Sequence, residues 1–422
     1  MEEKVLNGLS KPKRQTKQQL TCAYIRENYL DYARLRYDLI ADKLQLREET
    51  GWRYMTNRDI NTIVCQASEY HDANITNKEV MTALHSDLVP RVHPLREYIL
   101  TLSPYTPDQP DWIDMVAKQV KVKHREESSA EEREILEQRW RLCFKKWFVG
   151  MVASWMSDEV VNQYVLVLIG RQGCYKTTWL ERLMPPELKE YCCKLAGVTQ
   201  MGKDDRLRIA EFGLINIDEL DAISPRDVNK IKSIITSQDV NERAAYAYVK
   251  ERKVRLASFC ASSNKREFLS DVTGNRRWWP FEVDSILNPY YTTLPYTQMY
   301  AQAWALIQEE FNHWLEEEEN EVMELHNQEY RAQEGEEQLL PILYDIPAEG
   351  LGEFLTTSQI SERLCSFGGI RQPMALNRLG TVLGKMGYKS VTRRYHGVKM
   401  RGWLVYQRDT EEIDSIKRLL KN

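Results

Sequence analysis

The sequence predicts an α/β core built on a parallel sheet, with a helical domain before it and a winged-helix domain after it. Three short apolar runs lie in the middle of the chain, at Val165–Ile169, Leu214–Ile217 and Leu256–Cys260. Helix-like segments separate these runs, and strands buried on both faces that alternate with helices are typical of parallel sheets. Before them apolar residues recur mostly at helical spacing, and after them comes a basic pattern of two helices and two strands.

Length and composition limit the classes of protein to consider. The chain has 422 residues, 42% of them hydrophobic and 28% charged, which is ordinary for globular domains. No apolar stretch approaches the ~18–20 residues that a membrane span needs, and the N-terminus lacks the apolar region of a secretory signal. The eight cysteines are scattered without zinc-ligand spacing. We therefore expect no membrane segment and a cytoplasmic location.

Changes in composition divide the chain into six predicted segments. The first is polar and basic, and the fifth carries 12 acidic residues against one basic residue between Glu309 and Glu337. The predicted segments are a disordered basic tail (1–20), an N-terminal helical domain (21–105), a helical linker ending in an aromatic helix (106–155), the α/β core (156–288), an acidic helical segment (289–350) and the winged-helix domain (351–422).

A glycine-rich turn between the first strand and the next helix predicts a phosphate-binding loop. Backbone N–H groups at the helix N-terminus would bind phosphates, Lys176 would neutralise the terminal ones and the Thr177 hydroxyl would ligate Mg²⁺. Tyr175 stands where the general pattern has glycine. We expect ATP and Mg²⁺ as cofactors. The predicted nucleotide-binding residues are Gly170, Gln172, Gly173, Cys174, Tyr175, Lys176, Thr177 and Thr178.

Polar residues at the ends of the other two strands complete the predicted catalytic set. Asp218 would lie in the Mg²⁺ shell and Glu219 would polarise the attacking water, while Asn264 would orient water or the γ-phosphate. Asn264 could equally be a turn former. Arg276 or Arg277 would stabilise the transition state from a neighbouring subunit, unless this pair forms surface salt bridges or stacks on the adjacent tryptophans.

Two basic regions predict contacts with DNA. Residues 246–255 alternate like a β-hairpin with a basic tip at Lys250, Arg252 and Lys253, although an exposed turn explains this pattern as well. Residues 354–408 hold ten Lys or Arg and one acid, a net charge of +9, which phosphate neutralisation explains better than a solvated face. The predicted contacts of this second region are Arg378 and Lys385 on the groove-facing helix, Arg393 and Arg394, and Lys399 and Arg401 on the wing.

These motifs together resemble a known family. The runs GRQGCYKTT, IDELD, SSNKREFL and above all DVTGNRRWWPF are similar to those of the virulence-associated-protein-E-like P-loop ATPases of phages and bacterial mobile elements, which are related to superfamily 3 and AAA+ helicases. The resemblance covers about residues 35–285, including the upstream HPLREY segment. It implies an AAA+-like core, a hexamer-like ring, and a hairpin that tracks single-stranded DNA in the central pore.

The sequence thus predicts an ATP-dependent DNA helicase, translocase or replication initiator of a mobile element, acting as a homo-oligomer. An ATP-switched DNA-binding regulator of transposition or transcription, without unwinding activity, is the alternative. The basic C-terminal module disfavours a third possibility, a small-molecule kinase with the same phosphate-binding loop.

Overall fold

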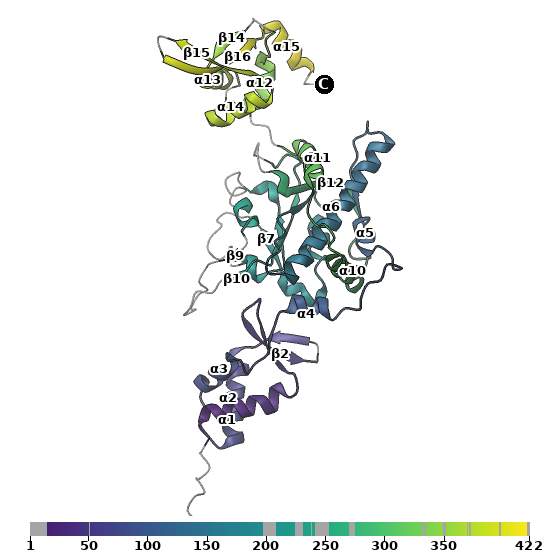
Figure 1. The fold of residues 1–422 in the computed structure, drawn as a ribbon, viewed down its shortest axis with the longest axis vertical. Helices are drawn as coiled ribbons and strands as arrows, with labels where there is room; N and C mark the ends of the chain where they lie inside the picture. The colour runs from purple at the N-terminus through teal and green to yellow at the C-terminus, as the bar shows by residue number, and fades with distance from the viewer. Residues whose placement is uncertain are drawn as a thin grey trace, which may run out of the picture. The chain divides into compact units, whose positions relative to one another are not determined.

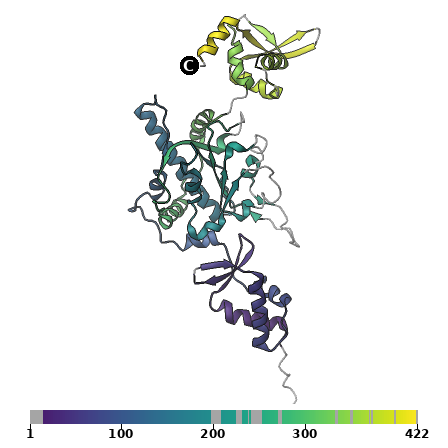
Figure 2. The same ribbon diagram turned by 180° about the vertical axis from the view of Figure 1, so that it is seen from behind.

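The computed structural model describes residues 15–49, 51–196, 208–223, 231–237, 239–240, 253–269, 275–331, 335–348, 352–368, 370, 373–395 and 398–419. The chain forms two compact units with a mixed α/β composition (Figures 1 and 2). One contains Met1–Asn264 with Phe281–Leu315, and the other contains Lys265–Pro280 with Glu316–Asn422. Within the described ranges, no helix combines the length and the apolar character needed to cross a membrane.

The first unit begins with a four-stranded sheet, in the order β3-β2-β1-β4, and four helices. β1, β2 and β3 are antiparallel, and β4 pairs in parallel with β1. Helices α2 and α3 each start at a threonine whose side chain closes a capping box, which satisfies backbone N–H groups that would otherwise lack a partner. The elements are α1 (Lys17–Ile25), β1 (Leu35–Asp38), β2 (Lys43–Glu48), β3 (Gly51–Tyr54), α2 (Asn57–His71), α3 (Asn77–Leu84), β4 (Arg91–Val92) and α4 (Pro94–Leu100).

The prediction of a helical domain over residues 21–105 did not include this sheet. The strands are short, and β2 alternates apolar and polar residues over only six positions, so the helical periodicity on both sides obscured them. The predicted tail 1–20 is also too long. Thr16 and Gln19 form a capping box that starts α1 at Lys17.

The central sheet of the first unit has six strands in the order β5-β12-β6-β11-β8-β7. β6, β11, β8 and β7 are mutually parallel, so the three predicted strands and their parallel pairing are confirmed. β5 pairs antiparallel with β12, so the whole sheet is mixed rather than parallel. The strands are β5 (Val120–Val122), β6 (Val165–Ile169), β7 (Cys192–Ala196), β8 (Leu214–Asp218), β11 (Ser258–Ser263) and β12 (Trp278–Ile286).

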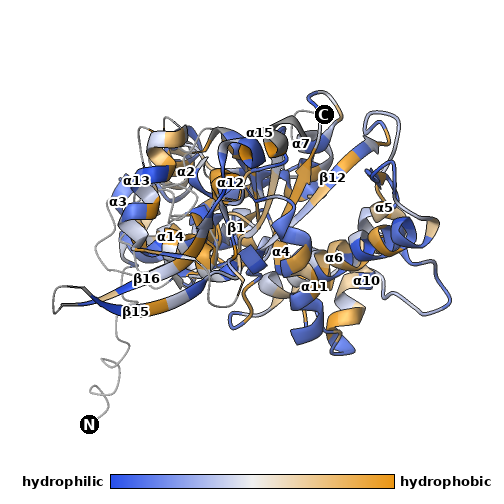
Figure 3. Cartoon of the chain, turned by 90° about the horizontal axis from the view of Figure 1, so that it is seen from above, coloured by the Kyte–Doolittle hydropathy of each residue, from blue (hydrophilic) through white to orange (hydrophobic). Residues whose placement is uncertain are grey.

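Helix α6 (Ala130–Met156) packs against β6 and β11 and belongs to the core. Its three tryptophans are fully buried. The Trp147 indole N–H donates to the Phe259 carbonyl at 2.9 Å, and that of Trp155 donates to the Gly213 carbonyl at 3.1 Å. The predicted linker 106–155 therefore supplies a strand and the main packing helix of the core. The other helices are α5 (Trp112–Ala117), α7 (Lys176–Glu181) and α10 (Tyr296–Gln308). β12 is largely hydrophobic, as Figure 3 shows.

The second unit has its own hydrophobic core. Leu355, Leu364, Leu379 and Trp403, which come from a strand, two helices and another strand, are all buried in it. The two helices and two strands predicted for the C-terminal region are present, together with further elements around them. The elements are α11 (Glu317–Gln328), α12 (Gly335–Leu343), β13 (Tyr344–Asp345), β14 (Glu353–Leu355), α13 (Thr357–Gly368), α14 (Leu376–Lys385), β15 (Lys389–Tyr395), β16 (Val398–Gln407) and α15 (Thr410–Leu419).

Candidate functional site

A cavity of about 290 Å³ lies where β6, β8 and β11 end at the same edge of the central sheet. The turn from Gln172 to Thr178 forms one side of this cavity, and Asp218, Glu219, Ser262 and Asn264 form the other. Ligands of open α/β sheets bind at the carboxyl ends of parallel strands. This cavity therefore brings together most of the residues predicted to bind nucleotide. It also contains three predicted catalytic residues that follow neighbouring strands, Asp218, Glu219 and Asn264.

The Lys176 side chain is held in place by neutral acceptors. Only 6% of the residue is exposed. Its Nζ donates to the carbonyl oxygens of Gly170 at 2.7 Å and Arg171 at 2.8 Å, and to Asn264 Oδ1 at 3.3 Å. Because none of these acceptors carries a formal charge, they orient the ammonium without neutralising it. The cavity therefore has a fixed positive charge suited to an anion.

Tyr175 has a left-handed backbone, with φ of 66°, at the N-cap of α7. This conformation explains why the general pattern has glycine at this position, since a side chain in the left-handed region costs roughly 1–2 kcal/mol. Gly173 is also left-handed, with φ of +84°, and a Cβ there would meet no atom within 4 Å. The turn therefore combines two left-handed residues with open space at Gly173.

Asp218 is the centre of a hydrogen-bond network. Its Oδ1 accepts from Thr177 Oγ1 and from Ser262 Oγ, each at 2.7 Å, and its Oδ2 pairs with Lys194 Nζ at 2.6 Å. Burial by itself raises the pKa of this carboxyl, but the hydrogen bonds from Lys194, Ser262 and Thr177 outweigh it and lower the pKa to about 2. Asp218 is therefore ionised at any physiological pH.

The sequence prediction did not include Lys194 or Ser262. Ser262 precedes the predicted Asn264 by two positions, and strand residues two apart point to the same face, so this signal was available. Lys194 lies on β7, which pairs in parallel with β8. Nothing in the local sequence Cys192–Ala196 indicates that pairing.

Asp221 positions Asn264 in the cavity. Its Oδ1 accepts from the backbone N–H of Asn264 at 3.1 Å and from Ser263 Oγ at 3.3 Å. Asn264 is thereby set beside Lys176, to which it offers its side-chain oxygen. Glu219 is exposed at the cavity wall, with a left-handed φ of 54°, and a carboxylate at this position has access to water.

The other predicted site residues belong to the second unit, line another cavity or lie outside the described residues. Arg276 and Arg277 form a short 3-10 turn in the second unit. Burial and then the neighbouring Arg276 lower the pKa of Arg277. Lys250 and Arg252 lie outside the described residues. In the C-terminal region Lys385 of α14 is exposed and Arg378 is half-buried, while Arg393 and Arg394 of β15 and Lys399 and Arg401 of β16 are exposed.

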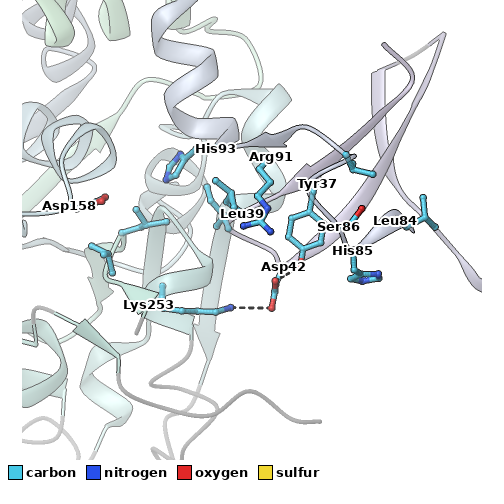
Figure 4. Close-up of a pocket in the computed structure, with 15 residues that line it drawn as sticks. Tyr37, Leu39, Asp42, Leu84, His85, Ser86, Arg91, His93, Asp158 and Lys253 are labelled. Atoms are coloured by element: carbon cyan, nitrogen blue, oxygen red, sulfur yellow. Dashed lines mark hydrogen bonds and ion pairs between the residues drawn. The ribbon is translucent and has the colours of Figure 1, made fainter. Parts of the chain in front are cut away.

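Lys253 lies on a second cavity, of about 400 Å³, within the first unit (Figure 4). It belongs to β10 (Lys253–Val254), which pairs antiparallel with β9 (Asp239–Val240). Residues of the N-terminal sheet, including Tyr37, form the other side of the cavity. Charged groups here form ion pairs with one another or with neighbours: Lys253 with Asp42 at 3.7 Å, Arg91 with Asp87 at 3.1 Å and Asp158 with Arg96. The lining charges are thus largely compensated.

The first cavity offers hard oxygen ligands. Among the residues that the structure describes, no group of three or more His, Cys, Asp or Glu side chains could hold a metal ion. The carboxylate of Asp218 and the hydroxyls of Thr177 and Ser262 lie within hydrogen-bond distance of one another. Such a set suits a cation that keeps several water ligands, as Mg²⁺ does, rather than a fully protein-ligated metal.

The central region is similar to one known domain family. The model of the virulence-associated protein E-like domain matches residues 128–332, which contain the whole cavity. This match supports the predicted resemblance to the virulence-associated-protein-E-like family over these residues.

The solved structures that resemble this chain have low sequence identity to it. The apo structure of the NrS-1 C-terminal region is 11% identical, with a TM-score of 0.46, and the alignment covers 93% of this chain and 100% of that chain. The A form apo structure of the same region is 10% identical, with a TM-score of 0.46 and the same coverage. No curated protein matches the sequence.

Proposed function

We propose that this protein is a DNA-dependent ATPase of the helicase type that serves the replication of a mobile genetic element. The observation that carries the proposal is a pair of features in one cavity. Among the described residues, the buried Lys176 is held by neutral acceptors, and the Thr177 hydroxyl donates to the strand-end carboxylate of Asp218 at 2.7 Å. P-loop NTPases use these groups to bind a triphosphate and its metal. The match of residues 128–332 to a domain family of virulence-associated protein E supports the mobile-element context.

The residues of the cavity fit ATP and Mg²⁺. Lys176 would bind the terminal phosphates, and Thr177 and Asp218 would hold Mg²⁺, which when bound neutralises charge on the phosphate oxygens. Asn264 would hold Lys176 in position, as its side-chain oxygen does here. Glu219 would accept a proton from the attacking water. Arg276 or Arg277 of a neighbouring subunit would stabilise the developing charge.

The C-terminal region would bind duplex DNA, and the 246–255 segment would contact a single strand in the pore of a ring oligomer. Four exposed cations on β15 and β16, at Arg393, Arg394, Lys399 and Arg401, support a phosphate-contacting surface. A winged-helix fold for this region is part of the proposal.

The proposal is tested by nucleotide hydrolysis with and without single-stranded DNA. We expect Lys176→Ala to abolish hydrolysis, because the cavity loses its fixed positive charge. Lys189→Ala is the matched control, since Lys189 is exposed on the short helix before β7. Hydrolysis by Lys176→Ala within twofold of the wild type would refute the assignment.

Strand displacement on a forked duplex then separates the two candidate functions. Unwinding that requires ATP and is lost in Lys176→Ala supports the helicase. Hydrolysis and ATP-dependent duplex binding without unwinding would instead identify a nucleotide-switched regulator.

A further inference from the structure

An ordered aromatic loop follows β12. Tyr290 is 75% exposed and Tyr291 is 89% exposed, which is unusual for side chains with so much apolar surface. The loop is nevertheless fixed. Asn288 Oδ1 accepts from the Tyr290 N–H at 3.0 Å and the Asn288 carbonyl accepts from Thr292 Oγ1 at 2.7 Å, while Arg182, just after α7, donates to the Thr292 carbonyl at 2.8 Å. The loop is thus anchored to the helix that follows the phosphate-binding turn.

Tyr175 connects this loop to the cavity. It lines the cavity, and its hydroxyl accepts a hydrogen bond from Asn288 Nδ2 at 3.3 Å. Its ring meets that of Tyr290 edge to face, with centroids 6.2 Å apart and an angle of 78°. Tyr175 therefore adopts a left-handed backbone that glycine would adopt more easily. Its aromatic ring lies at the cavity, next to the mostly exposed ring of Tyr290.

We propose that Tyr175 and Tyr290 form a stacking subsite for the aromatic base of the nucleotide bound in this cavity. This inference rests on the proposed function. Offset and edge-to-face arrangements leave ring faces available to a third ring, and stacking of a base on an aromatic side chain contributes about 1–3 kcal/mol. Because every base has a π-face, the subsite binds purine and pyrimidine nucleotides with modest differences in affinity. The contact offsets the left-handed backbone of Tyr175.

The experiment compares ATP with inorganic triphosphate, which has the same charged groups and no base. Dissociation constants are measured by calorimetry, with Mg²⁺, for the full chain. We expect the wild type to bind ATP about 5- to 150-fold more tightly than triphosphate, the factor that corresponds to stacking. Tyr290→Ala should reduce this ratio at least threefold through ATP alone, with triphosphate affinity within twofold of the wild type. Tyr290→Phe should keep the ratio, because the ring remains.

Tyr291→Ala is the matched control, since Tyr291 is a neighbour on the same loop and is still more exposed than Tyr290, and its ratio should equal that of the wild type. Unchanged ATP affinity in Tyr290→Ala, or an equal loss for both ligands, overturns the subsite and leaves the phosphate site intact. If neither ligand binds the wild type, the proposed function fails and the subsite fails with it.

Discussion

Replacing Lys194 by methionine should destabilise the nucleotide-free protein and at the same time tighten its binding of Mg²⁺. Lys194 Nζ lies 2.6 Å from Asp218 Oδ2, and the two side chains are 46% and 17% exposed. Lowering the Asp218 pKa from 3.8 to about 2 corresponds to about 2 kcal/mol, which is what remains of the hydrogen bonds from Lys194, Ser262 and Thr177 after the opposing effect of burial. Since solvent screens the exposed lysine, its share is about 1 kcal/mol.

A loss of about 1 kcal/mol should lower the melting temperature by about 2–4 °C for a domain of 150–250 residues, and by less for a larger one. The change in melting temperature is measured by thermal unfolding monitored with circular dichroism. The effect has a defined pH dependence. Asp218 has a lowered pKa in the folded state, so its stabilisation is complete above the unfolded-state value and is lost as the pH falls through about 2. The difference between Lys194→Met and the wild type should therefore be constant from about pH 5 to 8 and shrink below about pH 4.

If Mg²⁺ binds Asp218 as we propose, it replaces Lys194 there, so removing the competing ammonium should increase Mg²⁺ affinity about fivefold, the factor that corresponds to about 1 kcal/mol. Calorimetry with Mg²⁺ alone measures this directly. Lys189→Met, an exposed lysine three residues before β7, controls for loss of positive charge and should change neither quantity. Unchanged stability together with unchanged or weaker Mg²⁺ binding would show that the ion pair does not restrain Asp218.

Three further predictions concern the proposed activity. Glu219→Gln should bind nucleotide like the wild type but lose at least 100-fold in hydrolysis, on the order of general-base effects; equal loss of binding would make Glu219 structural. Mixing subunits that carry both Arg276→Ala and Arg277→Ala with Lys176→Ala subunits should recover some hydrolysis, because only mixed interfaces combine the intact arginines with an intact lysine, and verified mixed oligomers without recovery exclude action between subunits. Replacing Arg394 and Lys399, which are paired across β15 and β16, by alanine should lower the slope of log affinity for duplex DNA against log salt by about 0.9 per lost phosphate contact, and an unchanged slope would move the DNA surface elsewhere.

The turn that follows β6 could be predicted because its information is local. The strand Val165–Ile169, the glycines and Lys176 are consecutive, so pattern and geometry coincide. Asp218 and Asn264 could be predicted for a different reason. Each follows an apolar run, and the ends of parallel strands meet at one edge of a sheet. The predictable residues of the cavity are therefore those at the strand ends and in one contiguous turn.

What the sequence did not reveal depends on partners far along the chain. β7 contains Cys192, Cys193 and Lys194 and resembles no buried strand until it pairs with β8. Helix α6 is buried around its whole circumference in its C-terminal half, so no apolar stripe distinguished a core helix from a linker. The role of Lys194 and the place of α6 both follow from tertiary pairing rather than from local pattern.

The N-terminal sheet contributes to the geometry of the cavity without lining it. β7 is the last strand at one side of the central sheet, where β8 is its one strand partner among the described residues. Tyr191, the residue before β7, donates its hydroxyl to Asp38 Oδ2 at 2.6 Å, and Asp38 is fully buried on β1. Burial and this carboxylate raise the pKa of Tyr191, so the hydroxyl stays a donor throughout the physiological range. Because Lys194 follows three residues later, the buried Asp38 carboxylate fixes the start of the strand that brings an ammonium to Asp218. The N-terminal sheet thereby helps to set the charge balance of the candidate nucleotide site.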